Sequence, residues 1–268
     1  MSGSLKPIIL QTPAAEAHVY AQGAQVAHFQ PRGQKPLLFL SARSWFEPGQ
    51  PIRGGVPICF PWFGPGRGAT PQTPGHGVAR LQEWTAERLT AHSIAFRLEL
   101  APWAARFQVD VSAGLTMTLD VRNASAAPAT YEEALHTYLA VGDIRQVSVA
   151  GLAGAEYLDN TVGLAHKRQG PEPIRFTGET DRVYVNTRAT CTVDDPAWQR
   201  RLIIEKTGSD TTVVWNPWIA KAKAMPDFGD DEWPAMLCIE TANAKENAVT
   251  LAPGATHTLQ AVIRQDVL

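Results

Sequence analysis

Two residues far apart in the chain, His136 and Glu240, are candidates for proton-transfer chemistry. His136 lies in the segment YEEALHTYLAV at 131–141, which we expect to form one strand. Side chains in a strand alternate between two faces, so a register that buries the leucines of this segment turns His136 to the opposite face. Glu240 ends an apolar strand at 236–240, where burial would raise its pKa. Imidazole and carboxylate groups act as general acid and base near neutral pH.

Each of the two residues also has a structural interpretation. A single histidine is more often a core residue bonded to the backbone than a catalytic group. Glu240 could equally form an ion pair with Lys221 or with an arginine. The choice depends on whether the rest of the chain builds a site around them.

Two long segments without strand patterns are candidates for building such a site. Residues 48–80 contain PIRGGVPICFPWFG and PGHGVAR, and residues 215–233 read WNPWIAKAKAMPDFGDDEW. Long irregular segments are usually functional or disordered, and the aromatic content here argues against disorder. Trp62 and Phe63 could provide an aromatic face for a pyranose ring, or they could anchor the loop to the core.

The first of these segments also carries basic side chains. Arg53 precedes two glycines that allow a tight turn and a close approach to a ligand. Its guanidinium could hold a phosphate or a sugar hydroxyl through two hydrogen bonds, or it could be a surface arginine paired with a carboxylate. His76 and Arg80 form a second polar pair, which alone is a weak signal.

The elements that position these residues are predicted to be strands. Residues 17–30 read as a hairpin that turns at Gln22-Gly23, and 37–41 is a short apolar run. Alternating or apolar segments predict further strands at 94–100, 107–111, 115–121, 182–185, 190–193, 201–205, 211–216, 236–241, 248–251 and 257–264. No segment shows a convincing amphipathic helix. The sequence therefore predicts one all-β domain over 1–268, formed by two large antiparallel sheets packed as a sandwich.

Composition excludes several classes of partner. The chain has 24 Lys and Arg against 26 Asp and Glu, so neither a nucleic acid nor a membrane surface is an expected partner. The three cysteines are scattered, as in a reduced cytoplasmic protein. The N-terminal segment lacks the pattern of a secretory signal, and no apolar run approaches the ~18 residues of a membrane span. We expect a cytoplasmic monomer.

Motifs for other reaction classes are missing. The sequence contains no GxSxG elbow, HExxH helix, P-loop or GxGxxG after a strand. None of the seven histidines forms an HxH or HxxxH pair. We therefore expect no metal and no cofactor.

Several segments together resemble the glucose-6-phosphate 1-epimerase family, the hexose-6-phosphate mutarotases of the galactose mutarotase-like superfamily. These segments are IRGGVPICFPWFG (52–64), HGVAR (76–80), EALHTYLAVGDI (133–144), ETDRVY (179–184), VWNPW (214–218) and CIETAN (238–243). They follow the family order over about 18–264. The resemblance implies a large antiparallel β-sandwich with the site on its concave face, and interconversion of hexose-phosphate anomers without a cofactor.

The resemblance also implies roles for individual residues. His136 matches the family's acid and Glu240 its base. The positions that match substrate-binding residues are Arg53, His76, Arg80 and Asp181, with the arginines as expected phosphate contacts. Two alternatives stay open: an aldose 1-epimerase that acts on an unphosphorylated hexose, and a carbohydrate-binding sandwich without catalysis. The last alternative does not require His136 and Glu240 to share one cavity.

Overall fold

The computed structural model describes residues 5–68, 70–88 and 90–268. Its first large sheet contains the segments with the clearest alternation. In β8, for example, Leu115, Met117, Leu119 and Val121 are buried while the residues between them are partly exposed. The sheet has the antiparallel order β12-β16-β17-β21-β8-β7-β6-β5. The strands are β5 (Thr85–Arg88), β6 (Ser93–Leu100), β7 (Trp103–Asp110), β8 (Leu115–Asn123), β12 (Ser148–Ala150), β16 (Cys191–Asp195), β17 (Arg200–Thr207) and β21 (Thr256–Val267).

The second large sheet carries the candidate catalytic residues. Its antiparallel order is β14-β13-β15-β18-β19-β10-β4, and β11 also pairs with β19. The strands are β4 (Ile58–Cys59), β10 (Glu133–Leu135), β11 (Tyr138–Ala140), β13 (Glu156–Asp159), β14 (Ala165–Arg168), β15 (Thr180–Tyr184), β18 (Thr211–Asn216) and β19 (Met236–Asn243). All eight residues of β19 are buried, so both faces of this strand are covered.

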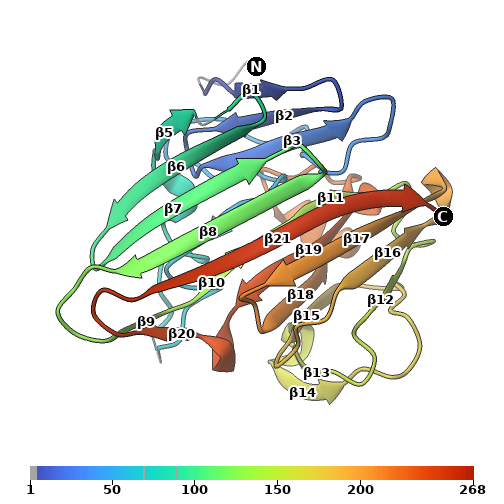
Figure 1. Ribbon diagram of the computed structural model, residues 1–268. Helices are drawn as coiled ribbons and strands as arrows, with labels where there is room; N and C mark the ends of the chain where they lie inside the picture. Colours follow the sequence, from blue (N-terminus) through green and yellow to red (C-terminus); the bar gives the residue numbers. More distant parts are fainter. Residues whose placement is uncertain (1–4, 69, 89) are drawn as a thin grey trace.

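The two large sheets pack face to face. In Figure 1 the sheet that contains β7, β8 and β21 lies in front of the sheet that contains β10, β18 and β19. One continuous apolar cluster joins them, and it includes Phe107 and Leu119 from one sheet and Leu139 and Ile239 from the other. The predicted all-β antiparallel sandwich is confirmed.

Smaller elements complete the fold. A three-stranded sheet contains β1 (Ile8–Gln11), β2 (Ala15–Tyr20) and β3 (Gln25–Pro31), of which the last two form the predicted hairpin. A ribbon pairs β9 (Ala129–Tyr131) with β20 (Val249–Leu251). The 3₁₀ turns are η1 (Ala79–Leu81), η2 (Asn160–Val162), η3 (Pro196–Trp198), η4 (Trp233–Ala235) and η5 (Lys245–Asn247). Among the described residues, no helix has the length and hydropathy needed to cross a membrane.

Three local predictions are wrong. A short α-helix, α1 (Trp218–Ala224), occupies part of the segment predicted to lack helix. Residues 37–41 do not form a strand and make only isolated bridges, from Leu38 to Leu139 and from Leu40 to Gly54. A third prediction, of one continuous strand at 131–141, fails because that segment is divided among β9, β10 and β11.

The division between β10 and β11 has a local cause. The Thr137 N–H turns back to donate to the Leu135 carbonyl at 2.8 Å, and the His136 N–H donates to the Pro57 carbonyl at 3.0 Å. These bonds replace ladder bonds, but the pairing with β19 keeps one register on both sides of the break. His136 therefore still faces away from the core, as the alternation predicts.

Candidate active site

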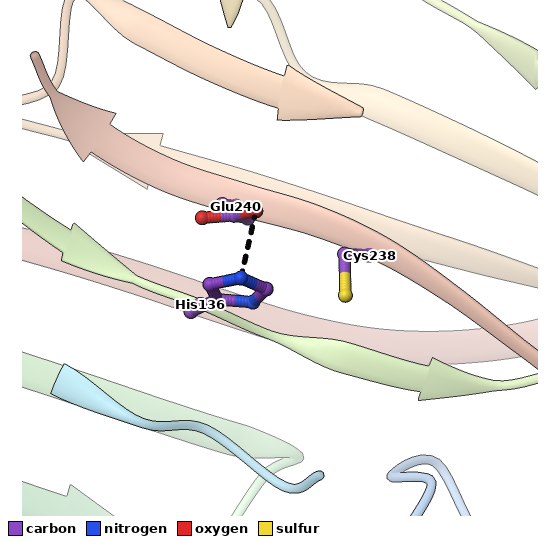
Figure 2. A group of neighbouring side chains, drawn as sticks. All are labelled: His136, Cys238 and Glu240. Atoms are coloured by element: carbon purple, nitrogen blue, oxygen red, sulfur yellow. Dashed lines mark ion pairs between the residues drawn. The ribbon is translucent and has the colours of Figure 1, made fainter. Parts of the chain in front are cut away.

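The unbroken register places His136 directly opposite Glu240. Leu135 pairs with Thr241, and Tyr138 pairs with Cys238 three residues further on. The side chains of directly opposed residues lie on the same face of a sheet and within contact distance. Accordingly, Nε2 of His136 lies 3.4 Å from Oε1 of Glu240, as the dashed line in Figure 2 shows. The two predicted catalytic groups therefore meet, although they are more than a hundred residues apart.

Burial favours the uncharged form of both groups. The His136 side chain is 13% exposed and that of Glu240 is 1% exposed. Burial, reinforced by the charge of Asp181, raises the pKa of Glu240 well above its usual range. Burial, together with the neighbouring His76 and Arg53, lowers the pKa of His136 well below its usual range. One proton shared between Nε2 and Oε1 then makes either a neutral pair or an imidazolium–carboxylate pair, so one group can donate while the other accepts.

Each member of the pair also has an atom available for a ligand. Nδ1 of His136 and Oε2 of Glu240 are both buried, and neither has a hydrogen-bond partner among the described residues. Unpaired buried polar atoms are uncommon, because each costs about 1–3 kcal/mol. A bound molecule with hydroxyl groups would satisfy both.

A cysteine lies beside the pair without joining its chemistry. Potential ligand atoms of His136, Cys238 and Glu240 come within 4.8 Å of one another, as Figure 2 shows. Burial and the neighbouring Glu240 raise the pKa of the Cys238 thiol well above its usual range. In the absence of a metal, Cys238 is therefore a neutral thiol beside the pair.

The pair lies in a pocket with a volume of about 460 Å³, within the usual range for small-molecule sites. The six residues singled out from the sequence all line it: Arg53, His76, Arg80, His136, Asp181 and Glu240. They come from β15, from β19, from the break between β10 and β11, and from the long segment at 48–80. The pocket therefore brings together every predicted site residue.

Three of the five N–H groups of Arg53 contact protein groups. Its Nε and Nη2 each lie 3.1 Å from Oδ2 of Asp227, and Nη1 donates to the Tyr138 hydroxyl at 3.0 Å. Burial opposes the charge, but Tyr138 and Asp227 outweigh it and raise the pKa of Arg53. The following glycines approach backbone and not the pocket: a Cβ on Gly54 would lie 2.5 Å from the Phe39 carbonyl oxygen. Arg53 is thus a rigid, charge-neutralised part of the wall.

His76 and Arg80 lie on the side of the pocket next to β4. Nδ1 of His76 is 3.4 Å from the Cys59 sulfur, and the His76 ring meets the His136 ring edge-on at a centroid distance of 5.6 Å. Burial, with the charges of Arg80 and two further cations, lowers the pKa of His76 to about 3. His76 is therefore neutral at physiological pH. Nη2 of Arg80 donates to the Gly75 carbonyl at 2.8 Å.

Asp181 lies on the opposite side of the pocket, on β15. It accepts a hydrogen bond from Nδ2 of Asn160 at 2.8 Å and lies 3.9 Å from Nζ of Lys221. Lys221 pairs more closely with Glu179, at 2.7 Å, and not with Glu240 as the structural alternative supposed. The order β15-β18-β19-β10-β4 separates Asp181 from the β4 side by four strand spacings, roughly 19 Å. The pocket thus has an acidic end and a basic end.

The aromatic lining differs in part from the sequence expectation. Phe63 lines the pocket, and its ring packs edge-on against His76 at 5.0 Å. Trp62 is outside the lining and donates to the Pro74 carbonyl, so it anchors the loop. Trp215, which the sequence did not single out for this role, meets the His136 ring edge-on at 5.9 Å.

Sequence reasoning also missed two residues at the basic end. Lys245 lines the pocket, and its Nζ lies 5.8 Å from the centre of the Phe63 ring. Glu132 is 1% exposed and accepts from the backbone N–H groups of Phe63, at 3.1 Å, and Lys245, at 2.7 Å. It thereby ties together the two loops that form this end. Only the acidic EE pair before Ala134 signals Glu132 in the sequence, and nothing signals Lys245.

The fold and the acid–base pair define a mutarotase-like β-sandwich. A crystal structure from Salmonella typhimurium, described as a "putative mutarotase", superposes with a TM-score of 0.90 at 27% identity, covering 98% of this chain and 91% of that one. The sequence profile of the aldose 1-epimerase family matches residues 6–264. The chain belongs to the aldose 1-epimerase family.

Two relatives within the family match at higher identity. One from Cenchrus ciliaris is 34% identical over 94% of this chain and 82% of its own length. One from Escherichia coli K12 is 33% identical over 95% of this chain and 89% of its own. Both carry the name "Putative glucose-6-phosphate 1-epimerase". The resemblance inferred from the sequence motifs is confirmed.

Proposed function

We propose that this protein interconverts the α and β anomers of a hexose 6-phosphate, with glucose 6-phosphate as the expected substrate. The observation that carries this proposal is the contact between His136 and Glu240 on neighbouring strands, inside one pocket of suitable size. The names of the two relatives support the phosphorylated substrate.

The chemistry requires one proton donor and one proton acceptor. In the opening step, the Glu240 carboxylate removes the proton of the anomeric hydroxyl while the His136 imidazolium protonates the ring oxygen. The C1–ring-oxygen bond breaks and an aldehyde forms. After rotation about C1–C2, protonated Glu240 returns a proton to the aldehyde oxygen, while neutral His136 removes one from the hydroxyl that closes the ring. The pair ends with the proton it began with, so no cofactor is required.

The burial of the pair suits this cycle. After ring opening, Glu240 is protonated and His136 is neutral, and these are the forms that burial favours. The pKa shifts therefore stabilise the state in which the substrate is open and uncharged at C1. Proton transfer by groups placed in this way contributes typically 10²–10⁴-fold each.

The order of the strands gives the bound sugar a direction. His136, Glu240 and Asp181 follow one another in this order across the sheet, at the break between β10 and β11, on β19 and on β15, and β18 lies between the last two strands. In a pyranose, the ring oxygen, the C1 hydroxyl and the C2 hydroxyl follow one another in the same sequence. The ring oxygen at His136 and the C1 hydroxyl at Glu240 then leave Asp181 to accept from a more distant hydroxyl. His76, Arg80 and Arg53 would contact the remaining part of the substrate.

Exchange NMR of the anomers tests this proposal. The wild-type protein should accelerate exchange between the anomers of glucose 6-phosphate, and His136→Ala should lower the rate by about 10²–10⁴-fold. His92→Ala is a matched control, because His92 pairs with Asp110 in the other large sheet. It should leave the rate unchanged. A folded His136→Ala protein with the wild-type rate would refute the role of His136 as the acid, whereas a wild-type protein that does not accelerate exchange would favour the carbohydrate-binding sandwich without catalysis.

A further inference from the structure

Three side chains that commonly bind metals share one face of the second large sheet. Cys238 and Glu240 are two positions apart on β19, so both point to the face that carries His136. One potential ligand atom from each of the three residues lies within 4.8 Å of the other two. Within residues 5–68, 70–88 and 90–268, this is the only such group of histidine, cysteine and acidic side chains. The acid–base pair is therefore part of a larger cluster, which Figure 2 shows.

The backbone register of the sheet fixes where these three side chains lie. Cys238 pairs with Tyr138 on β11 and with Trp215 on β18, and directly opposed residues share one face. The Tyr138 ring stacks on the His136 ring at a centroid distance of 4.8 Å and an interplanar angle of 13°. Trp215 meets the edge of the same imidazole. Strand pairing and aromatic packing thus hold the cluster rigid, and the rings shield it from water.

The distances within the cluster suit a tetrahedral ion. Zinc takes sulfur at about 2.3 Å and nitrogen or oxygen at about 2.0–2.2 Å, so its ligand atoms are roughly 3.3–3.8 Å apart. Nε2 of His136 and Oε1 of Glu240 already have this spacing, at 3.4 Å. The Cys238 sulfur would need to move by roughly 1 Å at most. Nδ1 of His136 and Oε2 of Glu240 have no hydrogen-bond partner among the described residues, so other hydrogen bonds do not hold these two side chains back from an ion.

An ion with two positive charges would also leave the buried cluster neutral. Without an ion, the thiol and the pair with its one shared proton carry no net charge. Metal ligands must be deprotonated, so binding releases the thiol proton and the shared proton to solvent. The thiolate of Cys238 and the carboxylate of Glu240 then balance the two positive charges of the ion. Asp181 adds negative field at both ligands, which Arg53 opposes at Cys238.

We propose that His136, Cys238 and Glu240 bind a thiophilic divalent metal ion, with Zn²⁺ as the best match, and that the bound ion inhibits the reaction. One thiolate, one imidazole and one carboxylate favour Zn²⁺ over Mg²⁺ and Ca²⁺, which prefer oxygen ligands. The fourth position of the tetrahedron opens toward the pocket, because His136 and Glu240 line it. A water molecule or a sugar hydroxyl completes the coordination there.

Inhibition follows because the ion occupies both proton-transfer groups. A lone pair that binds the metal cannot accept a proton, so Glu240 no longer removes the proton of the anomeric hydroxyl and His136 no longer carries one to the ring oxygen. This part of the inference rests on the proposed function. The metal site itself does not, since it depends only on the three ligands and their spacing.

Titration of Zn²⁺ into the anomer-exchange assay tests the inhibition. Zn²⁺ should inhibit the wild-type protein, a chelator should restore the rate, and Mg²⁺ at the same concentration should have no effect. Cys238 is outside the pocket lining, so Cys238→Ala should keep the uninhibited rate within about twofold but need roughly 10-fold more Zn²⁺ for half-inhibition. Cys191→Ala is the matched control, because Cys191 is an equally buried cysteine on β16 in the other large sheet. Equal sensitivity of the wild-type and Cys238→Ala proteins to Zn²⁺ would overturn the inference.

Co²⁺ as a spectroscopic probe separates the metal site from the proposed function, because it requires no turnover. Stoichiometric Co²⁺ should give the wild-type and Cys191→Ala proteins a thiolate-to-cobalt charge-transfer band and the visible absorption of a tetrahedral ion. Cys238→Ala should lack the charge-transfer band, as should Cys238→Ser, which keeps the size of the side chain. If the wild-type protein shows the band but does not accelerate anomer exchange, the proposed function fails while the metal site stands. If it accelerates exchange but shows no band, the metal site fails.

Discussion

Replacement of Glu240 by glutamine should lower activity without lowering stability. Glutamine keeps the shape of the side chain but cannot exchange a proton with the anomeric hydroxyl. The loss of one general base reduces kcat by about 10²–10⁴-fold, equivalent to ~3–5 kcal/mol of transition-state stabilisation. Among the described residues, Oε1 of Glu240 makes a polar contact with Nε2 of His136 and Oε2 has no hydrogen-bond partner, so the substitution breaks few polar interactions of the folded state.

The effect on stability follows from the raised pKa of Glu240. In the unfolded chain this carboxyl ionises near its ordinary pKa of 4.5, whereas burial makes the folded protein retain the proton to higher pH. The unfolded state then binds fewer protons, so Glu240 lowers the free energy of unfolding by up to ~1.4 kcal/mol per pH unit between its two pKa values. Glutamine removes this penalty. The variant should therefore become more stable than the wild-type protein, and the difference should grow as pH rises.

Exchange NMR and urea unfolding at pH 5 and pH 8 measure both effects. The matched control is Glu205→Gln, since Glu205 is half-exposed and pairs with Arg264 on the neighbouring strand. It should keep the wild-type kcat and change stability by less than about 1 kcal/mol at either pH. A Glu240→Gln protein with near wild-type kcat would refute the assignment of the base. A stability difference that shrinks with rising pH would refute the burial argument.

Three further substitutions test the walls of the pocket. Arg53→Ala leaves the buried carboxylate of Asp227 without its cation, so urea unfolding should show a loss of about 3–5 kcal/mol. Recovery of stability in the Arg53→Ala, Asp227→Asn double variant is the control. His76 has a pKa of about 3 in the folded protein, so between pH 6.5 and pH 3 the unfolded chain takes up a proton that the folded protein does not. The free energy of unfolding should therefore fall by up to ~1.4 kcal/mol for each unit that the pH is lowered through this range. His76→Gln should reduce this slope, and an unchanged slope would contradict the assignment. Glu132→Gln leaves one backbone N–H without an acceptor and should cost about 1–3 kcal/mol in urea unfolding. An unchanged free energy of unfolding would contradict the role of Glu132 in holding the two loops together.

The sequence predicts the strands best where one face is buried and the other is solvated. β7 and β8 alternate between buried and partly exposed residues along their lengths, so period two is visible without structural information. α1 escapes the same reasoning because seven residues are too few to establish a helical period. The break after Leu135 also leaves no trace, because hydrogen bonds to Pro57 and within 135–137 produce it.

The residues of the candidate site are likewise only partly predictable from the sequence. The alternation of side chains along the strand predicts the face on which His136 lies. The prediction that Glu240 is its partner depended on the family resemblance. Lys245 could not be predicted, because its place beside Phe63 arises where two loops from distant parts of the chain converge on Glu132. Local sequence patterns report which residues share an element, but they do not report which loops meet.

The pairing of His136 with Glu240 across one ladder has a consequence for how this enzyme can change. The separation between the two proposed reacting groups depends on the register of β10 and β11 against β19, and the segments at 62–68 and 244–248 lie outside that ladder. Insertions or exchanges within residues 62–76 or 244–248 would then alter which sugar is admitted while leaving proton transfer intact. New specificities could evolve on this framework without reinventing the reaction.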